Sequence, residues 1–267
     1  MMYTFGLFLA ILIGVVLGLV GGGGSILTVP LVHYLFGTSM LLATSYSLFV
    51  VAVSSGIGVF KKRKSGTIDY RNGLVFVIPS MIVAFFIRKT IMPEFPSEFN
   101  LGGYDLTRDT VISILLIVVM LFVAIKSFTS KKAPSENKTS TLIIVLFGIL
   151  TGVLSGFIGA GGGFIIVPIL LRMGLDMKKA VGTSMYIICI QSTVALSGDF
   201  FNEEIMHGKE SIDWTLLFSL TLLTIVGVFI GTYLQKYLTG KYLRKIFSVV
   251  LIVVALGMSL ELIRGIT

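Results

Sequence analysis

The sequence is poor in charged residues, cysteine and histidine, and each shortage excludes a class of site. Only 13% of the 267 residues are charged, against roughly 25% in an ordinary soluble domain. The single cysteine, Cys189, cannot form an intramolecular disulfide and offers no cysteine pair to a metal. With only His33 and His207 as further ligands, we expect no metal site and no cofactor. We also expect no enzyme, because the middle of the apolar segments holds no His, Asp or Glu from which a catalytic group could be built.

Apolar residues dominate the sequence instead. They make up 55% of the chain, and the mean hydropathy is +1.00. They fall into segments of about 16–23 residues, long enough to cross ~30 Å of hydrocarbon as helix and without the alternation of barrel strands. The first residues have neither the basic start nor the cleavage site of a signal peptide, so we expect them in the mature fold. The sequence therefore predicts an all-α integral membrane protein.

Two glycine-rich stretches show that the chain is duplicated. Residues 20–31 read VGGGGSILTVPL, and residues 158–169 read IGAGGGFIIVPI. The small-Thr-Ser step at 43–45 recurs at 182–184, so the similarity extends into the next helix. The identical positions include Gly14, Gly18, Gly21, Gly23, Gly24 and Pro30, which match Gly152, Gly156, Gly159, Gly161, Gly162 and Pro168. We predict a first transmembrane repeat at 1–130, a polar cytoplasmic linker at 131–139 and a second transmembrane repeat at 140–267.

The distribution of charge predicts which side of the membrane each connection faces. The net charge of +8 reflects basic cytoplasmic loops rather than a nucleic-acid partner. The acidic connections at 88–109 and 199–213 are expected outside, with Arg88 and Asp199 at their margins. Most of the 21 Lys and Arg residues lie in four segments that we expect to be cytoplasmic, at 61–71, 126–138, 172–179 and 236–245.

The spacing of these connections predicts the path of each repeat. Residues 140–158 and 164–171 begin and end on the same side, so we expect a helix hairpin with GAGGG at its tip. Residues 4–20 and 26–36 are expected to form the equivalent hairpin from the other side. Three full spans follow each hairpin, at 39–60, 72–90 and 110–128 and at 178–198, 214–236 and 242–263. Three is odd, so the second repeat is inverted and both termini are extracytoplasmic, as in many multi-pass secondary transporters.

The hairpin tips are candidate anion sites. A turn inside the membrane leaves unpaired backbone N–H groups, and the positive helix ends that follow the glycines would both point toward the bilayer midplane. Hydroxyl and amide groups on the next helices could also bind an anion. They belong to Thr44, Ser45, Ser54, Ser55, Thr183, Ser184, Gln191, Ser192 and Thr193. The alternative is that the glycines serve only close helix packing, as small-xxx-small pairs do.

The paired motifs, GLVGGGGSILTVPLV and GFIGAGGGFIIVPIL, each with its small-Thr-Ser step, resemble those of the sulfite exporter TauE/SafE family, also called the toluene-sulfonate uptake permease family. The resemblance implies a plasma-membrane transporter of small sulfur-containing anions such as sulfite, sulfoacetate or other organosulfonates, here expected to export them. An anion channel and an importer of sulfonates or related organic anions are the alternatives. Membrane lipid is the other expected partner, and the outer helices are candidates for a homodimer surface. The motif residues carried over as site-formers are Gly21, Gly22, Gly23, Gly24, Ser25, Pro30, Gly159, Ala160, Gly161, Gly162, Gly163 and Pro168.

The inverted topology can be tested by labelling single cysteines in a Cys189→Ala background. We expect Ser135→Cys, in the basic linker, to react with a membrane-impermeant maleimide only from the cytoplasmic side. Ser211→Cys, in the acidic connection, should react only from outside. Labelling of both positions from one side would show that the inverted topology is wrong.

Overall fold

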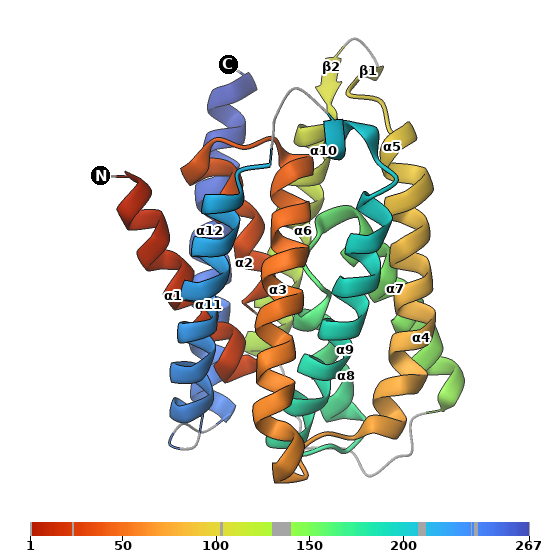
Figure 1. Ribbon diagram of the computed structural model, residues 1–267, viewed down its shortest axis with the longest axis vertical. Coiled ribbons are helices and arrows are strands. Elements are labelled where there is room, and N and C mark those ends of the chain that lie inside the picture. Colours follow the sequence, from red (N-terminus) through yellow and green to blue (C-terminus); the bar gives the residue numbers. More distant parts are fainter. Residues whose placement is uncertain are drawn as a thin grey trace.

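The prediction of an all-α integral membrane protein is confirmed by the computed structural model (Figure 1). The structure describes residues 2–22, 24–101, 104–129, 140–207, 212–235, 237 and 240–266, so the linker predicted at 131–139 lies outside the described residues. Within the described part of the chain, seven helical segments are long and apolar enough to cross a membrane, at 40–65, 70–94, 108–126, 141–158, 177–199, 214–234 and 247–264.

The first half of the chain contains a short-armed hairpin and three long helices. The arms are α1 (Met2–Val20) and α2 (Ser25–Pro30), and α2 continues as the π-helix η1 (Leu31–Leu35). The long helices are α3 (Met40–Lys62) with the 3-10 turn η2 (Arg63–Ser65), α4 (Tyr70–Phe86) with the π-helix η3 (Ile87–Ile91) and α5 (Met92–Glu94), and α6 (Arg108–Thr129). A small antiparallel hairpin, β1 (Glu98–Leu101) with β2 (Tyr104–Thr107), precedes α6 and is an addition to the predicted helices.

The second half repeats this order of elements. Its hairpin consists of α7 (Thr141–Ile158) and α8 (Gly163–Arg172), and its long helices are α9 (Met177–Asp199), α11 (Trp214–Leu234) and α12 (Gly240–Ile266). The short helix α10 (Glu203–His207) lies between α9 and α11. In Figure 1 the β-hairpin and α10 lie at the upper end of the bundle, and the connection between α3 and α4 lies at the lower end. We call these the acidic end and the basic end.

Polar caps determine where four of the long helices begin. Ser39, Asp69, Asp176 and Asp213 each accept a hydrogen bond from the backbone N–H three residues ahead, at the starts of α3, α4, α9 and α11 respectively. Such a cap satisfies an N–H group that has no partner inside the helix. The sequence alternates between capping residues and long apolar runs, and this alternation sets the lengths of the spans.

The two halves pack by exchanging helices, with glycines at the contacts. Helix α1 packs on α11 of the other half, where a Cβ atom on Gly14 would lie 2.1 Å from the carbonyl oxygen of Thr224. Helix α7 packs on α4 in the same way, and a Cβ atom on Gly152 would lie 2.5 Å from the carbonyl oxygen of Ser80. Small residues permit this close approach of backbones, which drives helix association in lipid. The first helix of each half is therefore held by the half to which it does not belong.

Helices α3 and α9 form the centre of the bundle. They pack on each other. Of the 18-residue apolar stretch in each helix, 78% is buried in α3 and 61% in α9, against 28% in α12. Helices α6 and α12 pack together at one side. Large apolar side chains remain exposed on the outer helices, as expected for lipid contact, and include Ile78, Ile82, Val118, Phe122, Leu222, Val226, Val253 and Leu256. The hairpin tips therefore lie against the two helices that are most shielded from lipid.

The contact between α1 and α11 can be tested with a single added methyl group. In Gly227→Ala the new Cβ atom would lie 2.1 Å from the carbonyl oxygen of Ile11, so the helices must separate, and we expect a loss of about 1–3 kcal/mol. The matched control is Gly257→Ala in α12, where no atom lies within 4 Å of the added methyl. The measurement is thermal unfolding of both variants in detergent. Equal melting temperatures would contradict the close packing of α1 on α11.

Candidate functional site

Both glycine-rich stretches form turns that need glycine for their backbone angles. In the first turn φ is +72° at Gly21 and +119° at Gly22. In the second turn φ is +71° at Gly159, +61° at Gly161 and +66° at Gly162. Side chains other than hydrogen are strained in this region of φ. The chain therefore reverses direction at these glycines, as the sequence predicts.

The two turns meet inside the bundle. A Cβ atom on Gly22 would lie 2.7 Å from Cα of Gly163, so the two backbones are in contact. Cδ1 of Ile188, on α9, lies beside both: it would be 2.2 Å from a Cβ atom on Gly22 and 2.4 Å from one on Gly163. Larger residues cannot occupy these positions without moving a neighbouring element. The junction of the turns is therefore packed, with an apolar side chain at its centre.

Each turn also lies against the long central helix of the other half. The Ser184 hydroxyl, on α9, donates a hydrogen bond to the carbonyl oxygen of Gly21. Gly159 of the second turn lies on α3, where an added Cβ atom would be 2.5 Å from the carbonyl oxygen of Thr44. The matching Thr-Ser steps at 44–45 and 183–184 are thus brought to matching places. Thr44 and Ser184 therefore contact the turn of the half to which they do not belong.

Most of the predicted hydroxyl groups make hydrogen bonds within the protein. Ser25 donates to the carbonyl oxygen of Gly22 at 2.6 Å, which stabilises the first turn itself. Thr44 and Ser45 both donate to the carbonyl oxygen of Leu41, at 2.7 Å and 3.3 Å. The Thr183 hydroxyl accepts from the backbone N–H of Asp69 at 2.9 Å, at the start of α4. These hydrogen bonds stabilise the first turn and the starts of α3 and α4.

Polar atoms without partners lie beside the second turn, and the buried Thr28 hydroxyl on α2, which follows the first turn, also has none among the described residues. Gln191 is fully buried and donates from Nε2 to the carbonyl oxygen of Thr151 at 3.3 Å. Its Oε1 and the hydroxyl of buried Ser192 have no hydrogen-bond partner among the described residues. A Cβ atom on Gly161 would lie 2.9 Å from that Ser192 oxygen. Helix α8 begins here, and its first N–H groups have no acceptors within the helix.

The remaining predicted residues are placed less centrally. Gly24 is the N-cap of α2, and Ala160 is buried within the second turn. Pro30 lies where α2 passes into the π-helix, and Pro168 is exposed in the interior of α8. The prolines are therefore helix features several residues beyond the turns. Gly23 lies outside the described residues.

Arg88 and Asp199 are buried, although each is the first residue of a predicted external connection. Arg88 has no exposed surface, because the helical segment continues through η3 and α5 to Glu94 instead of ending at 90. Its Nη1 lies 3.3 Å from Oδ1 of Asp199, the last residue of α9. The periodicity of small residues at Gly73, Ser80 and Ala84, all on the buried face of α4, reaches Arg88 four residues later and could have revealed its position.

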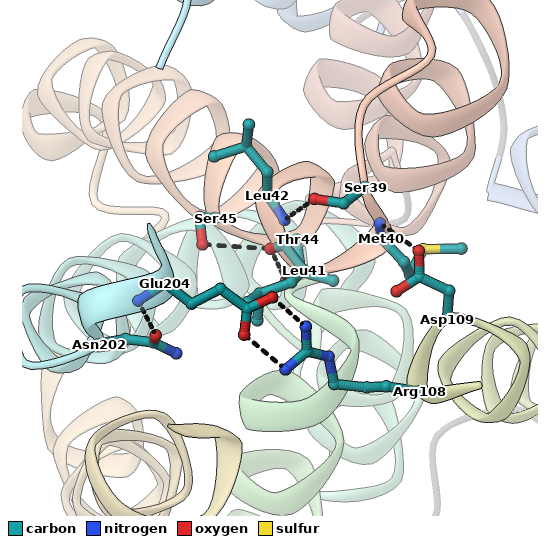
Figure 2. A network of polar contacts seen from close by, with 10 residues as sticks. All are labelled: Ser39, Met40, Leu41, Leu42, Thr44, Ser45, Arg108, Asp109, Asn202 and Glu204. Carbon is teal, nitrogen blue, oxygen red and sulfur yellow. Dashed lines mark hydrogen bonds and ion pairs between the residues drawn. The ribbon is translucent and has the colours of Figure 1, made fainter. Parts of the chain in front are cut away.

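A second ion pair lies nearby at the acidic end (Figure 2). Arg108, at the start of α6, donates from Nη1 and Nη2 to the two carboxylate oxygens of Glu204, at 2.9 Å and 2.5 Å. The Glu204 backbone N–H donates to Oδ1 of Asn202 at 3.0 Å. On the same helix as Arg108, the Asp109 carboxylate accepts from the backbone N–H of Met40, the first residue of α3. These contacts join α6 to α10 and to the start of α3.

Comparison with known proteins agrees with this architecture. The family described as "Sulfite exporter TauE/SafE" matches residues 6–258. A "probable membrane transporter protein" of Methanocaldococcus jannaschii is 27% identical over 269 residues, which cover 94% of this chain and 95% of that protein. A similarly named protein of Bacillus subtilis is 28% identical over 222 residues, covering 82% of this chain and 85% of its own.

One relative carries the family name itself. "Sulfite exporter TauE/SafE family protein 1" of Arabidopsis thaliana is 25% identical over 125 residues, or 47% of this chain and 26% of that protein. No solved structure matches the chain significantly. The family match covers nearly the whole chain, both glycine-rich turns included. The chain therefore belongs to the sulfite exporter TauE/SafE family of membrane transporters.

Proposed function

We propose that this protein is a secondary transporter that exports small sulfur-containing anions, such as sulfite, sulfoacetate or other organosulfonates, across the plasma membrane. The substrate class and the direction follow from the name of the family to which the chain belongs. An anion leaving a cell with a negative interior gains about 2.3 kcal/mol per charge and per 100 mV, so the membrane potential is sufficient to drive export. The same protein would import a sulfonate if an outside-to-inside gradient were larger.

The second glycine turn is the best-supported place for the anion. It combines the start of α8, a ten-residue helix, with the unpartnered Ser192 hydroxyl and Gln191 amide oxygen. Helix starts carry a partial positive charge and free N–H groups, which favour oxyanions. Buried polar atoms are normally hydrogen-bonded, so an unpartnered hydroxyl beside such a helix end supports the presence of a ligand or water there. This unpartnered Ser192 hydroxyl is the observation that carries the proposal.

The packing of the turns favours a carrier over a channel. A channel needs a continuous wetted path, whereas Gly22 and Gly163 are in backbone contact and Ile188 fills the space beside them. Passage of an anion then requires the two turns to separate. The two halves exchange helices α1 and α7, which supports rocking of one unit against the other about the turns. We propose the inverted arrangement, with both termini outside, as the basis of this alternating access.

The proposed substrate class can be tested by thermal unfolding of the detergent-purified protein in sulfite, sulfate, thiosulfate, sulfoacetate, phosphate and chloride. A ligand that binds only the folded state stabilises it by about 2.7 kcal/mol at a hundredfold excess over Kd. We expect a rise in melting temperature with sulfite or a sulfonate and little change with chloride. The absence of a shift with every sulfur-containing anion would contradict the proposal.

The site at the second turn can be tested with Ser192→Ala, which adds no volume. If its hydroxyl binds the anion, the variant should lose roughly ten- to a hundredfold in sulfite affinity, the equivalent of one hydrogen bond to a charged group at about 1.5–3 kcal/mol. The matched control is Ser55→Ala on α3, whose hydroxyl donates to the carbonyl oxygen of Val51 in its own helix and should not affect binding. Affinities are measured by isothermal titration calorimetry. A Ser192→Ala protein with wild-type sulfite affinity would remove this turn from the proposed site.

A further inference from the structure

The ion pair between Arg88 and Asp199 is the most unusual polar contact in the described part of the bundle. Arg88 is fully buried, and Asp199 is 3% exposed. The pair joins η3, which continues α4 in the first half, to the end of α9 in the second. A Cβ atom on Gly198 would lie 2.7 Å from Cβ of Arg88, so the glycine lets the arginine stem lie directly on α9. Arginine and aspartate are almost never fully buried unless they are paired.

The ion pair has poor geometry, so a gain in stability does not explain why it is buried. A single contact of 3.3 Å joins Nη1 to Oδ1. Nε and Nη2 of Arg88 and Oδ2 of Asp199 have no hydrogen-bond partner among the residues that the structure describes. A buried ion pair offsets its desolvation only when its geometry is excellent and the remaining polar atoms are satisfied. By contrast, the partly exposed pair Arg108–Glu204 makes two short, parallel hydrogen bonds.

Further unused hydrogen-bond donors lie close to this pair. Asn202 is 1% exposed, its backbone N–H donates to the carbonyl oxygen of Asp199, and its Nδ2 has no partner among the described residues. On α3, Thr44 contacts the second glycine turn at Gly159. Figure 2 shows Asn202 and Ser45 on neighbouring elements of the acidic end. The unpartnered donors of Arg88 and Asn202 therefore lie on either side of Asp199 in its contacts, one through the ion pair and one through the backbone.

We propose that Arg88 binds the oxyanion during transport and that Asp199 is the resident counter-ion that holds it when no anion is present. This inference rests on the proposed function and identifies the residue that recognises the substrate's charge. The guanidinium of arginine presents a planar fork of donors that matches two oxygens of a sulfite or sulfonate group. An arriving anion and the Asp199 carboxylate compete for the same N–H groups, so the carboxylate lowers the affinity that Arg88 alone would provide.

The proposal predicts opposite effects on stability and on binding for Asp199→Asn. Removing the carboxylate leaves Arg88 buried and without its counter-ion, so the melting temperature should fall. Sulfite should nevertheless bind about tenfold or more tightly than to the wild type, because the competing negative charge is gone. The double variant Arg88→Gln/Asp199→Asn replaces the ion pair by uncharged side chains of similar shape. We expect this protein to recover its melting temperature and to lose sulfite binding. Binding is measured by isothermal titration calorimetry with sulfite, and separately with chloride.

The matched control is Glu261→Gln, which also removes one negative charge. Its partner Arg264 is 3.6 Å away, and both side chains are exposed, so sulfite affinity should stay at the wild-type value. If the wild type binds sulfite and Asp199→Asn binds it equally or less tightly, this inference is overturned and the proposed function stands. Binding by neither protein would overturn both. An equal gain in affinity for chloride would overturn the assignment of Arg88 to oxyanions.

Discussion

The structure depends on the requirement that a backbone turning inside a membrane must keep its polar groups away from lipid. Lipid offers no hydrogen bonds, so such a turn persists only where protein or water surrounds it. Here α3 and α9 provide that surrounding, and the turns can reach each other only because Gly22 and Gly163 have no side chains. The hydroxyl of Ser184 satisfies the carbonyl oxygen of Gly21 within the turn.

The sequence predicted those features that arise from local chemistry. The spans, the two glycine turns and the family could be predicted because hydropathy, helix caps and the glycine-rich motifs are written in consecutive residues. The exchange of α1 and α7 between the halves was not predicted, because the small residues of each helix indicate close packing without naming the partner. The burial of Arg88 was not predicted either, since charge counts assigned it to a connection while its helix continued to Glu94.

The candidate site was predicted in outline and not in detail. Repetition of the Thr-Ser steps indicated matching places in the two halves, and Thr44 and Ser184 each contact a turn. A sequence does not tell which hydroxyl is used by a neighbouring carbonyl. Ser25 and Thr44 donate to backbone oxygens, whereas Ser192, on the same helix as Ser184, has no partner in the described structure. Which hydroxyl groups remain without a protein partner therefore depends on tertiary contacts.

The exchange of helices between the halves also constrains how the protein can be made. The N-terminal helix α1 is synthesised first, yet the surface on which its glycines pack belongs to α11, close to the other end of the chain. The first half cannot bury its own glycine-rich helix and turn while translation continues. The turn itself is covered once α8 and α9 have been made, because Gly21 and Gly22 contact residues of these helices. A chain that ends between α9 and α11 would thus have a covered turn beside a helix α1 that has no surface on which to pack its glycines.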